Sequence, residues 1–220
     1  MRSYRQHCGL AKALDLVGDR WTLLIVRDLL AGPARYSDLL HSLPGIATNL
    51  LTERLREMER AGLIALYPVA GTGRARAPVQ FTLTDRGRAL EPVIAAFGVW
   101  SAPFMGEPGR RDRLRARWLT VPAYLYLRDV RPSGPAVRVA LRCTGDDSLL
   151  VETTGTERVR ARVGDASDAD LALTGPTRVV FRALMGRSSL ADAKRQGLAV
   201  DGDERILARL RSQPAVRRPG

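Results

Sequence analysis

Residues 45–64 read GIATNLLTERLREMERAGLI, and their apolar spacing predicts one amphipathic helix. The apolar side of a helical wheel carries Ala47, Leu50, Leu51, Leu55, Met58 and Gly62. The polar side carries Thr48, Asn49, Thr52, Glu53, Arg56, Glu59 and Arg60. Arg54 falls on the apolar side, so we expect it to pair with an acid or to reach the edge of the helix. One face therefore packs on a core, and the other is free for a partner.

The segment before this helix completes the spacing of a helix-turn-helix motif. Residues 37–43 form a short helical pattern, and Pro44 and Gly45 make the turn. In such a motif the second helix enters the major groove, and short polar side chains at its start contact bases or phosphates. An ordinary amphipathic surface helix is the alternative interpretation, because such spacing also arises by chance.

A predicted β-hairpin directly after the helix favours the DNA interpretation. Two β-type runs, residues 63–68 and 79–83, flank the segment GTGRARAP at residues 71–78. Arg74 and Arg76 lie at the tip of this hairpin, where a winged helix places its wing against DNA.

Further helical patterns surround the motif. Residues 10–17 and 21–30 show apolar residues at three- and four-residue steps. After the hairpin, Thr84 is the predicted N-cap of a helix that runs to about Met105. Pro92 is expected to kink or restart that helix.

The second half of the chain has a different pattern. A domain boundary is expected near Gly106, where helix breakers precede an arginine run at residues 110–117. Residues 113–127 favour a helix, and residues 136–143, 148–154, 158–163 and 170–174 favour an antiparallel meander. Helices are expected at residues 177–185, 189–196 and 203–212, with a short strand at residues 198–200.

Composition narrows the function classes only loosely. The formal charge of +12 attracts polyanions, but residues 1–105 carry 13 basic against nine acidic side chains, so the excess lies mostly in the second half. No apolar run is long enough to predict a transmembrane helix or a signal peptide, so a cytoplasmic protein without membrane association is expected.

No cofactor, metal or catalytic motif is expected. His7 and His41, the only histidines, belong to no recognisable catalytic or metal-ligand pattern. Cys8 and Cys143, the only cysteines, form no CxxC motif and are expected to be reduced. An enzyme is therefore not the favoured class.

The N-terminal half closely resembles the HxlR branch of the MarR-like winged-helix regulators. The resemblance covers residues 4–105. Its motifs are Cys8, AKALDLVGDRWTLLI (11–25), RDL (27–29), YSDL (36–39), LPGI (43–46), LTERL (51–55), ERAGLI (59–64) and LTDRG (83–87). The resemblance implies a homodimer whose two recognition helices enter successive major grooves of double-stranded DNA at a roughly palindromic operator. The expected DNA-contacting residues are Ser37, Thr48, Asn49, Thr52, Arg56, Arg60, Arg74 and Arg76.

Cys8 occupies the position at which redox- and electrophile-sensing members of this family carry their reactive cysteine. Such chemistry needs an exposed thiol with a lowered pKa, and the neighbouring Arg5 and His7 favour the thiolate.

The second half resembles sterol-carrier-protein-like domains. The motifs are DADLALTG (168–175), LMGRSSLADA (184–193) and GLAVDGD (197–203). The resemblance implies a five-stranded sheet beneath helices and an apolar tunnel for a lipid-like ligand. The expected lining is Trp118, Tyr124, Tyr126, Val180, Phe181, Leu184 and Met185, although these side chains would equally fill an ordinary core.

The expected fold class is therefore α+β. Residues 1–105 form a winged helix-turn-helix DNA-binding and dimerisation domain, and residues 106–117 are a basic linker or helix start. Residues 118–213 form a C-terminal α+β sterol-carrier-like domain with an antiparallel sheet, and residues 214–220 are a disordered tail. The arginine run is either a solvated linker or a second phosphate contact.

Three functions remain open at this point. The first is a transcriptional regulator, a repressor, whose DNA affinity responds to a hydrophobic small molecule in the second domain. The second is a regulator that senses through Cys8, with a structural second domain. The third is a lipid carrier that uses its basic surface for membranes or scaffolding.

Overall fold

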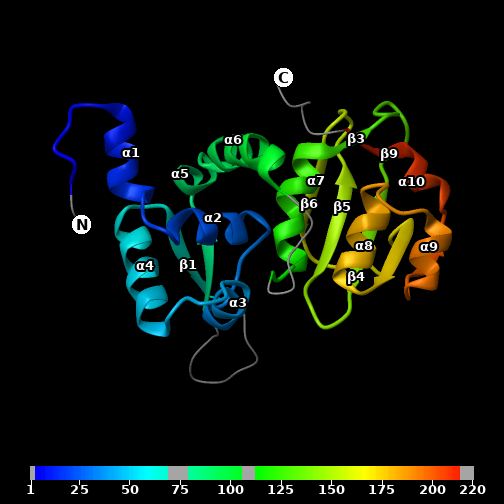
Figure 1. Cartoon of the computed structure of the whole chain (residues 1–220), viewed down its shortest axis with the longest axis horizontal. Coiled ribbons are helices and arrows are strands. Elements are labelled where there is room, and N and C mark those ends of the chain that lie inside the picture. The colour runs from blue at the N-terminus through cyan, green and yellow to red at the C-terminus, as the bar shows by residue number, and fades with distance from the viewer. Residues whose placement is uncertain (1–2, 69–78, 106–111, 214–220) are drawn as a thin grey trace. The chain divides into compact units, whose positions relative to one another are not determined.

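The computed structural model describes residues 3–68, 79–105 and 112–213 (Figure 1). Arg74, Arg76, the first part of the arginine run and the C-terminal tail lie outside the described residues. The chain divides into two compact units, Met1–Ile94 and Ala95–Gly220.

The first unit is built from helices and one β-hairpin. Its elements are α1 (Gly9–Val17), α2 (Thr22–Leu30), α3 (Tyr36–Ser42), α4 (Thr48–Arg60), β1 (Ile64–Pro68), β2 (Val79–Leu83) and α5 (Asp85–Arg88). The four helices and two strands expected here are confirmed, because the apolar spacing and the Gly and Pro breaks are local signals. Strands β1 and β2 pair antiparallel, and Ala34 adds a bridge to Phe81.

Two contacts join the hairpin to the helices that flank it. Gly62 ends α4 with a φ of +70°, a backbone conformation that suits glycine. Thr84 is the N-cap of α5, as expected: its hydroxyl accepts from the Gly87 N–H at 3.1 Å and donates to the Gly62 carbonyl at 2.6 Å. A Cβ atom at Gly87 would overlap the Leu63 carbonyl oxygen, so this close approach requires glycine.

The helix expected from Thr84 to about Met105 is interrupted. It divides into α5 and α6 (Glu91–Ser101), followed by the 3-10 helix η1 (Ala102–Phe104). Pro92 restarts the helix as expected, since a first-turn residue needs no intrahelical N–H partner. The division between the two units falls inside α6, earlier in the chain than the boundary expected at Gly106.

The second unit contains a five-stranded sheet in the order β6-β5-β4-β7-β8. Its elements are η2 (Ala116–Leu119), α7 (Thr120–Tyr126), β3 (Leu127–Asp129), β4 (Arg138–Cys143), β5 (Ser148–Thr153), β6 (Val159–Val163), β7 (Leu171–Gly175), α8 (Thr177–Leu184), α9 (Leu190–Arg195), β8 (Ala199–Gly202), α10 (Arg205–Arg209) and β9 (Leu210–Ser212). Figure 1 shows α8 lying against this sheet, and Val180 and Leu184 pack in the same core as Val139 and Leu171.

Three sequence-based expectations for this unit are wrong in part. The four-strand meander ends at β6, because β7 crosses over and pairs parallel with β4. Residues 113–127 do not form one helix: Arg115 is extended, and the α-helix begins at Thr120. The helix expected to end at Ser212 ends at Arg209, because residues 210–212 pair with β3. Strand pairing depends on distant partners, so local periodicity does not reveal it.

A buried ion pair holds the C-terminal elements to β3. Both Nε and Nη2 of Arg209 donate to the carboxylate of Asp129, each at 2.7 Å. The Asp129 side chain is fully buried, and that of Arg209 is 11% exposed. The hydrogen bonds from Arg209 hold the pKa of Asp129 below its usual value. Within the described ranges, no helix is long and apolar enough to span a bilayer.

Replacing Arg209 by methionine leaves the Asp129 carboxylate buried without its cation. We expect Arg209→Met to lower the free energy of unfolding by about 3 to 5 kcal/mol near pH 7, measured by urea denaturation. Because the folded-state pKa of Asp129 is depressed, the pair stabilises the fold above the unfolded-state pKa, and this contribution is lost as the pH falls through the folded-state pKa. The difference between wild type and variant should therefore shrink below about pH 4.

Arg205→Met is the matched control, since Arg205 pairs with Asp203 but is 91% exposed. It should change stability little, because solvent screens exposed ion pairs. Equal effects of the two substitutions would contradict a structural role for the Asp129–Arg209 pair.

Candidate nucleic-acid interface

Helix α4 separates cleanly into a buried side and an open side. Leu51, Leu55 and Met58 are buried in the core of the first unit. Thr48, Asn49, Arg56 and Arg60 are exposed, as the helical wheel indicates. These four side chains of the predicted DNA-facing surface are thus accessible to a partner.

A buried carboxylate fixes the helix that precedes α4. Asp28 on α2 is fully buried, pairs with Arg27 at 2.9 Å and accepts a hydrogen bond from the Ser42 hydroxyl at the end of α3. A charged group without water must be hydrogen-bonded or paired, so this contact specifies how α3 packs on α2. Sequence reasoning did not select Asp28. The feature of the sequence that could have identified Asp28 is the position of an acid between the core residues Ile25 and Leu29.

Tyr36 joins the start of α3 to the start of α4. Its hydroxyl donates to the Thr48 carbonyl oxygen at 2.7 Å. The Thr52 hydroxyl donates to the same carbonyl at 2.9 Å and lies 3.3 Å from the Tyr36 oxygen. Thr52 is only half-exposed, so its hydroxyl supports the helix-turn-helix geometry besides facing outward. Ser37 is exposed at the first turn of α3, and its hydroxyl donates to Asp38 at 3.3 Å.

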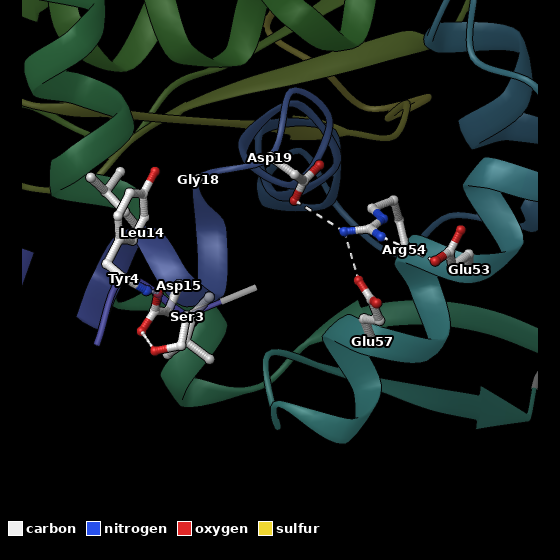
Figure 2. A pocket seen from close by; sticks show the side chains of 10 residues that line it. Ser3, Tyr4, Leu14, Asp15, Gly18, Asp19, Glu53, Arg54 and Glu57 are labelled. Atoms are coloured by element: carbon white, nitrogen blue, oxygen red, sulfur yellow. Dashed lines mark hydrogen bonds and ion pairs between the residues drawn. The ribbon is translucent and has the colours of Figure 1, made fainter. Parts of the chain in front are cut away.

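Arg54 has the internal role expected for its inward position. Figure 2 shows it between α4 and the turn that carries Asp19. Its Nη1 lies 2.6 Å from a Glu57 oxygen and 3.8 Å from an Asp19 oxygen, and its Nη2 lies 3.4 Å from Glu53. Arg54 therefore pairs with acids and anchors α4.

The arginine run does not behave as one segment. Arg113 is exposed, whereas Arg117 is only 2% exposed and its Nε donates to Asp147 at 2.9 Å. The interpretation of the run as a solvated linker is wrong for Arg117, because a charge that is buried and paired belongs to the core of the second unit.

The seven expected ligand-lining residues fall into two groups. Val180, Leu184 and Met185 are buried in the core cluster of the second unit. Trp118, Tyr124, Tyr126 and Phe181 are half-buried. The Arg158 guanidinium lies 5.1 Å from the ring centre of Tyr124, and the Tyr126 hydroxyl donates to the Gly98 carbonyl at 3.4 Å.

The two cysteines have opposite environments. Cys8 is exposed at the N-cap of α1, and the backbone N–H groups of Ala11 and Leu10 lower the pKa of its thiol. Burial raises the pKa of the Cys143 thiol to about 11. Only Cys8 thus combines exposure with stabilisation of the thiolate.

Comparison with known proteins places the first unit in a family of regulators. Residues 16–108 match the model of the HxlR-like helix-turn-helix family. The chain is 33% identical over 94 residues to the HTH-type transcriptional regulator YvaP of Bacillus subtilis, a match that covers 43% of this chain and 84% of the relative. It is 33% identical over 102 residues to the HTH-type transcriptional regulator YodB of the same species, covering 46% of this chain and 86% of the relative.

A solved structure gives a match of similar extent. The reduced form of YodB from B. subtilis is 32% identical, with a TM-score of 0.39, and the match covers 47% of this chain and 99% of that one. Each of these matches covers less than half of the present chain.

The tyrosine hydroxyl that joins α3 to α4 is open to direct test. We expect Tyr36→Phe to lower the free energy of unfolding by about 1 kcal/mol, because it leaves the Thr48 carbonyl with one donor fewer. Tyr67→Phe is the control, since Tyr67 on β1 is 63% exposed. Chemical denaturation of both variants gives the comparison, and indistinguishable midpoints would show that the Tyr36 hydroxyl contributes nothing.

Proposed function

The chain belongs to the HxlR-like helix-turn-helix family, and we propose that it binds double-stranded DNA as a transcriptional regulator. The observation that carries this proposal is the exposed polar side of α4. Within the described ranges the side chains of Thr48, Asn49, Arg56 and Arg60 are exposed and form no hydrogen bond or ion pair, while Leu51, Leu55 and Met58 anchor the helix. Relatives over this region are HTH-type transcriptional regulators. The positive end of the α4 dipole adds to the attraction for phosphate.

We assign different roles to the polar residues of α4. Asn49 has the amide that pairs with adenine in the major groove, and Arg56 has the guanidinium that suits guanine or phosphate. Arg60, farther along α4, contacts the phosphate backbone. Ser37 on α3 and the hairpin arginines Arg74 and Arg76 supply the flanking contacts.

We propose a homodimer that binds a roughly palindromic operator, because two-fold symmetry of the protein is matched by symmetry in its site. Exposed apolar side chains on two helices support this assembly. Leu10 on α1 is 69% exposed, and Val93, Phe97 and Trp100 are exposed on α6. A monomer that leaves these groups in water gains by covering them with a second copy. We infer that the dimer is a cytoplasmic protein and not an enzyme. We infer further that it is a repressor, because occupancy of promoter DNA is enough to block transcription.

We also propose that the second unit holds a sterol-carrier-like site for a hydrophobic effector. The half-buried rings of Tyr126 and Phe181, which pack against the core that contains α8, support it, and Trp118 and Tyr124 are half-buried as well. Such an effector regulates DNA binding only if its affinity differs between the DNA-competent and DNA-incompetent states of the dimer.

A second candidate regulates the same DNA binding through Cys8. The favouring observation is an exposed thiol whose pKa two backbone N–H groups lower. In this scheme the second unit is a structural or dimerising module.

The DNA proposal predicts how single substitutions on α4 change the affinity for an operator and its salt dependence. Footprinting on duplex DNA from upstream of the chain's own gene should show a protected, roughly palindromic site. Asn49→Ala and Arg56→Ala should each weaken binding to that site by about tenfold, within the 1–3 kcal/mol typical of one specific contact. Arg60→Ala should make the negative slope of log K against log salt less steep by about one.

The control is Arg205→Ala, which removes an exposed arginine from the second unit and should leave operator affinity unchanged. Binding of all DNA with equal affinity, with no protected site, would favour the lipid-carrier alternative instead. Equal losses for Asn49→Ala and Arg205→Ala would remove α4 from the interface.

Cysteine chemistry separates the two proposed sensors. Because the pKa of Cys8 is lowered, its alkylation by iodoacetamide should rise at a lower pH than that of a free cysteine, while Cys143 stays unmodified. Mass spectrometry locates the label.

If Cys8 is the sensor, a quinone releases wild-type protein from DNA but not the Cys8→Ser variant. If the second unit is the sensor, Cys8→Ser responds normally and native mass spectrometry shows a co-purified apolar molecule.

A further inference from the structure

Three arginines of the second unit lie side by side on paired strands. Arg128 on β3 is paired with Arg211 on β9, and an antiparallel bridge joins Arg128 to Arg158, the residue before β6. Residues directly opposite each other on antiparallel strands project to the same face, with Cβ atoms about 5 Å apart. The three side chains therefore form one row, the arginine cluster. We propose that the arginine cluster binds the phosphate group of a small molecule.

The close approach of these arginines is unfavourable unless an anion lies between them. Like charges directly opposite each other on paired strands destabilise a sheet. The Asp129 N–H donates to the Glu157 carbonyl at 2.8 Å, so the neighbouring residues Arg128 and Arg158 are a non-hydrogen-bonded pair. Side chains are closer in such a pair than in the hydrogen-bonded kind. A bound anion would convert this repulsion into two attractive contacts.

No carboxylate forms an ion pair with the arginine cluster within the described ranges. Asp129 follows Arg128 on β3, but neighbouring side chains on a strand point to opposite faces, and the Asp129 carboxylate is buried against Arg209. The register of the bridge places Glu157 opposite Asp129, on that same other face. The positive charges of the row therefore remain for a ligand.

The protein holds two of the guanidinium groups beside one residue of α7, Tyr124. Arg128 donates from Nη1 to the Tyr124 carbonyl at 3.3 Å and from Nη2 to the Leu125 carbonyl at 2.9 Å. The Arg158 guanidinium lies 5.1 Å from the centre of the Tyr124 ring. Carbonyl oxygens and an aromatic ring orient a guanidinium but carry no net negative charge. The two groups are therefore positioned without being neutralised.

The arginine cluster also keeps hydrogen-bond donors for a ligand. Arg158 and Arg211 are exposed. In the part of the chain that the structure describes, the Arg158 guanidinium forms no hydrogen bond, and Arg211 uses only its Nε, which donates to the Ala208 carbonyl at 3.3 Å. A guanidinium presents parallel N–H groups that match two phosphate oxygens. A phosphate group carries nearly two negative charges near pH 7, so it suits a row of three arginines better than a single carboxylate does.

The test compares two small anions of different chemical class. Full-length protein is titrated in low-salt buffer with inorganic pyrophosphate and with malonate, and binding heat is measured without DNA. We expect saturable binding of pyrophosphate, at least about tenfold tighter than that of malonate. Added salt should weaken this binding, because the arginine cluster is open to solvent.

Substitutions then locate the site. Arg158→Gln and Arg211→Gln should each weaken pyrophosphate binding about fivefold or more, while Arg128 is left in place because it holds the end of α7. Arg178→Gln is the matched control, since Arg178 is exposed on α8 and its replacement removes the same charge from the same unit, outside the cluster. The control should leave pyrophosphate affinity unchanged. Absence of saturable pyrophosphate binding, equal affinity for malonate, or equal effects of the three substitutions would overturn the proposal.

Operator binding by the same variants separates a small-molecule site from a DNA contact. We expect Arg158→Gln and Arg211→Gln to leave the affinity for DNA and its salt dependence unchanged. If both variants make that salt dependence less steep, the arginine cluster contacts the DNA backbone and the small-molecule proposal is wrong. Because none of these substitutions lies on α4, failure of the pyrophosphate site and failure of the DNA proposal are observed separately.

Discussion

The fixed position of α4 depends on a chain of polar contacts that runs through α3. At one end of α3, the buried Asp28 carboxylate accepts from Ser42 and pairs with Arg27. At the other end, the Tyr36 hydroxyl donates to the Thr48 carbonyl. Apolar packing alone permits a helix to slide or rotate by small amounts, whereas a desolvated carboxylate tolerates few geometries. These two contacts therefore set where the first residues of α4 stand, and those residues are the ones proposed to read DNA.

The difference between paired and unpaired arginines explains why the net charge of the chain is a weak guide to its function. Arg54, Arg117 and Arg209 each pair with a carboxylate at 2.9 Å or less and belong to the interior or its edge. Arg56 and Arg60 are exposed and remain available to phosphate. A sum over the sequence counts both classes alike. The structure separates them, because burial and pairing decide whether a guanidinium acts within the fold or on a partner.

Sequence reasoning succeeded where the determining signal was local. The α4 wheel, the Thr84 cap and the restart at Pro92 all follow from residues within one or two turns of each other. Sequence reasoning failed where the partner was distant in the sequence. Strand β7 pairs parallel with β4, and Arg117 pairs with Asp147, 30 residues later, in the connection between β4 and β5. Asp28 was missed for the same reason, since its partner Ser42 lies on another helix, 14 residues away.

Arg54 links the helix proposed to face DNA to the turn before α2. Its Nη1 lies 3.8 Å from an Asp19 oxygen and 2.6 Å from a Glu57 oxygen, so one guanidinium joins that turn to α4. Asp19 is itself held by the backbone N–H groups of Trp21 and Thr22 at the start of α2. Any regulation that moves α4 must therefore break or stretch this link, whereas a charge added near α4 acts on phosphate by Coulomb attraction without moving the helix.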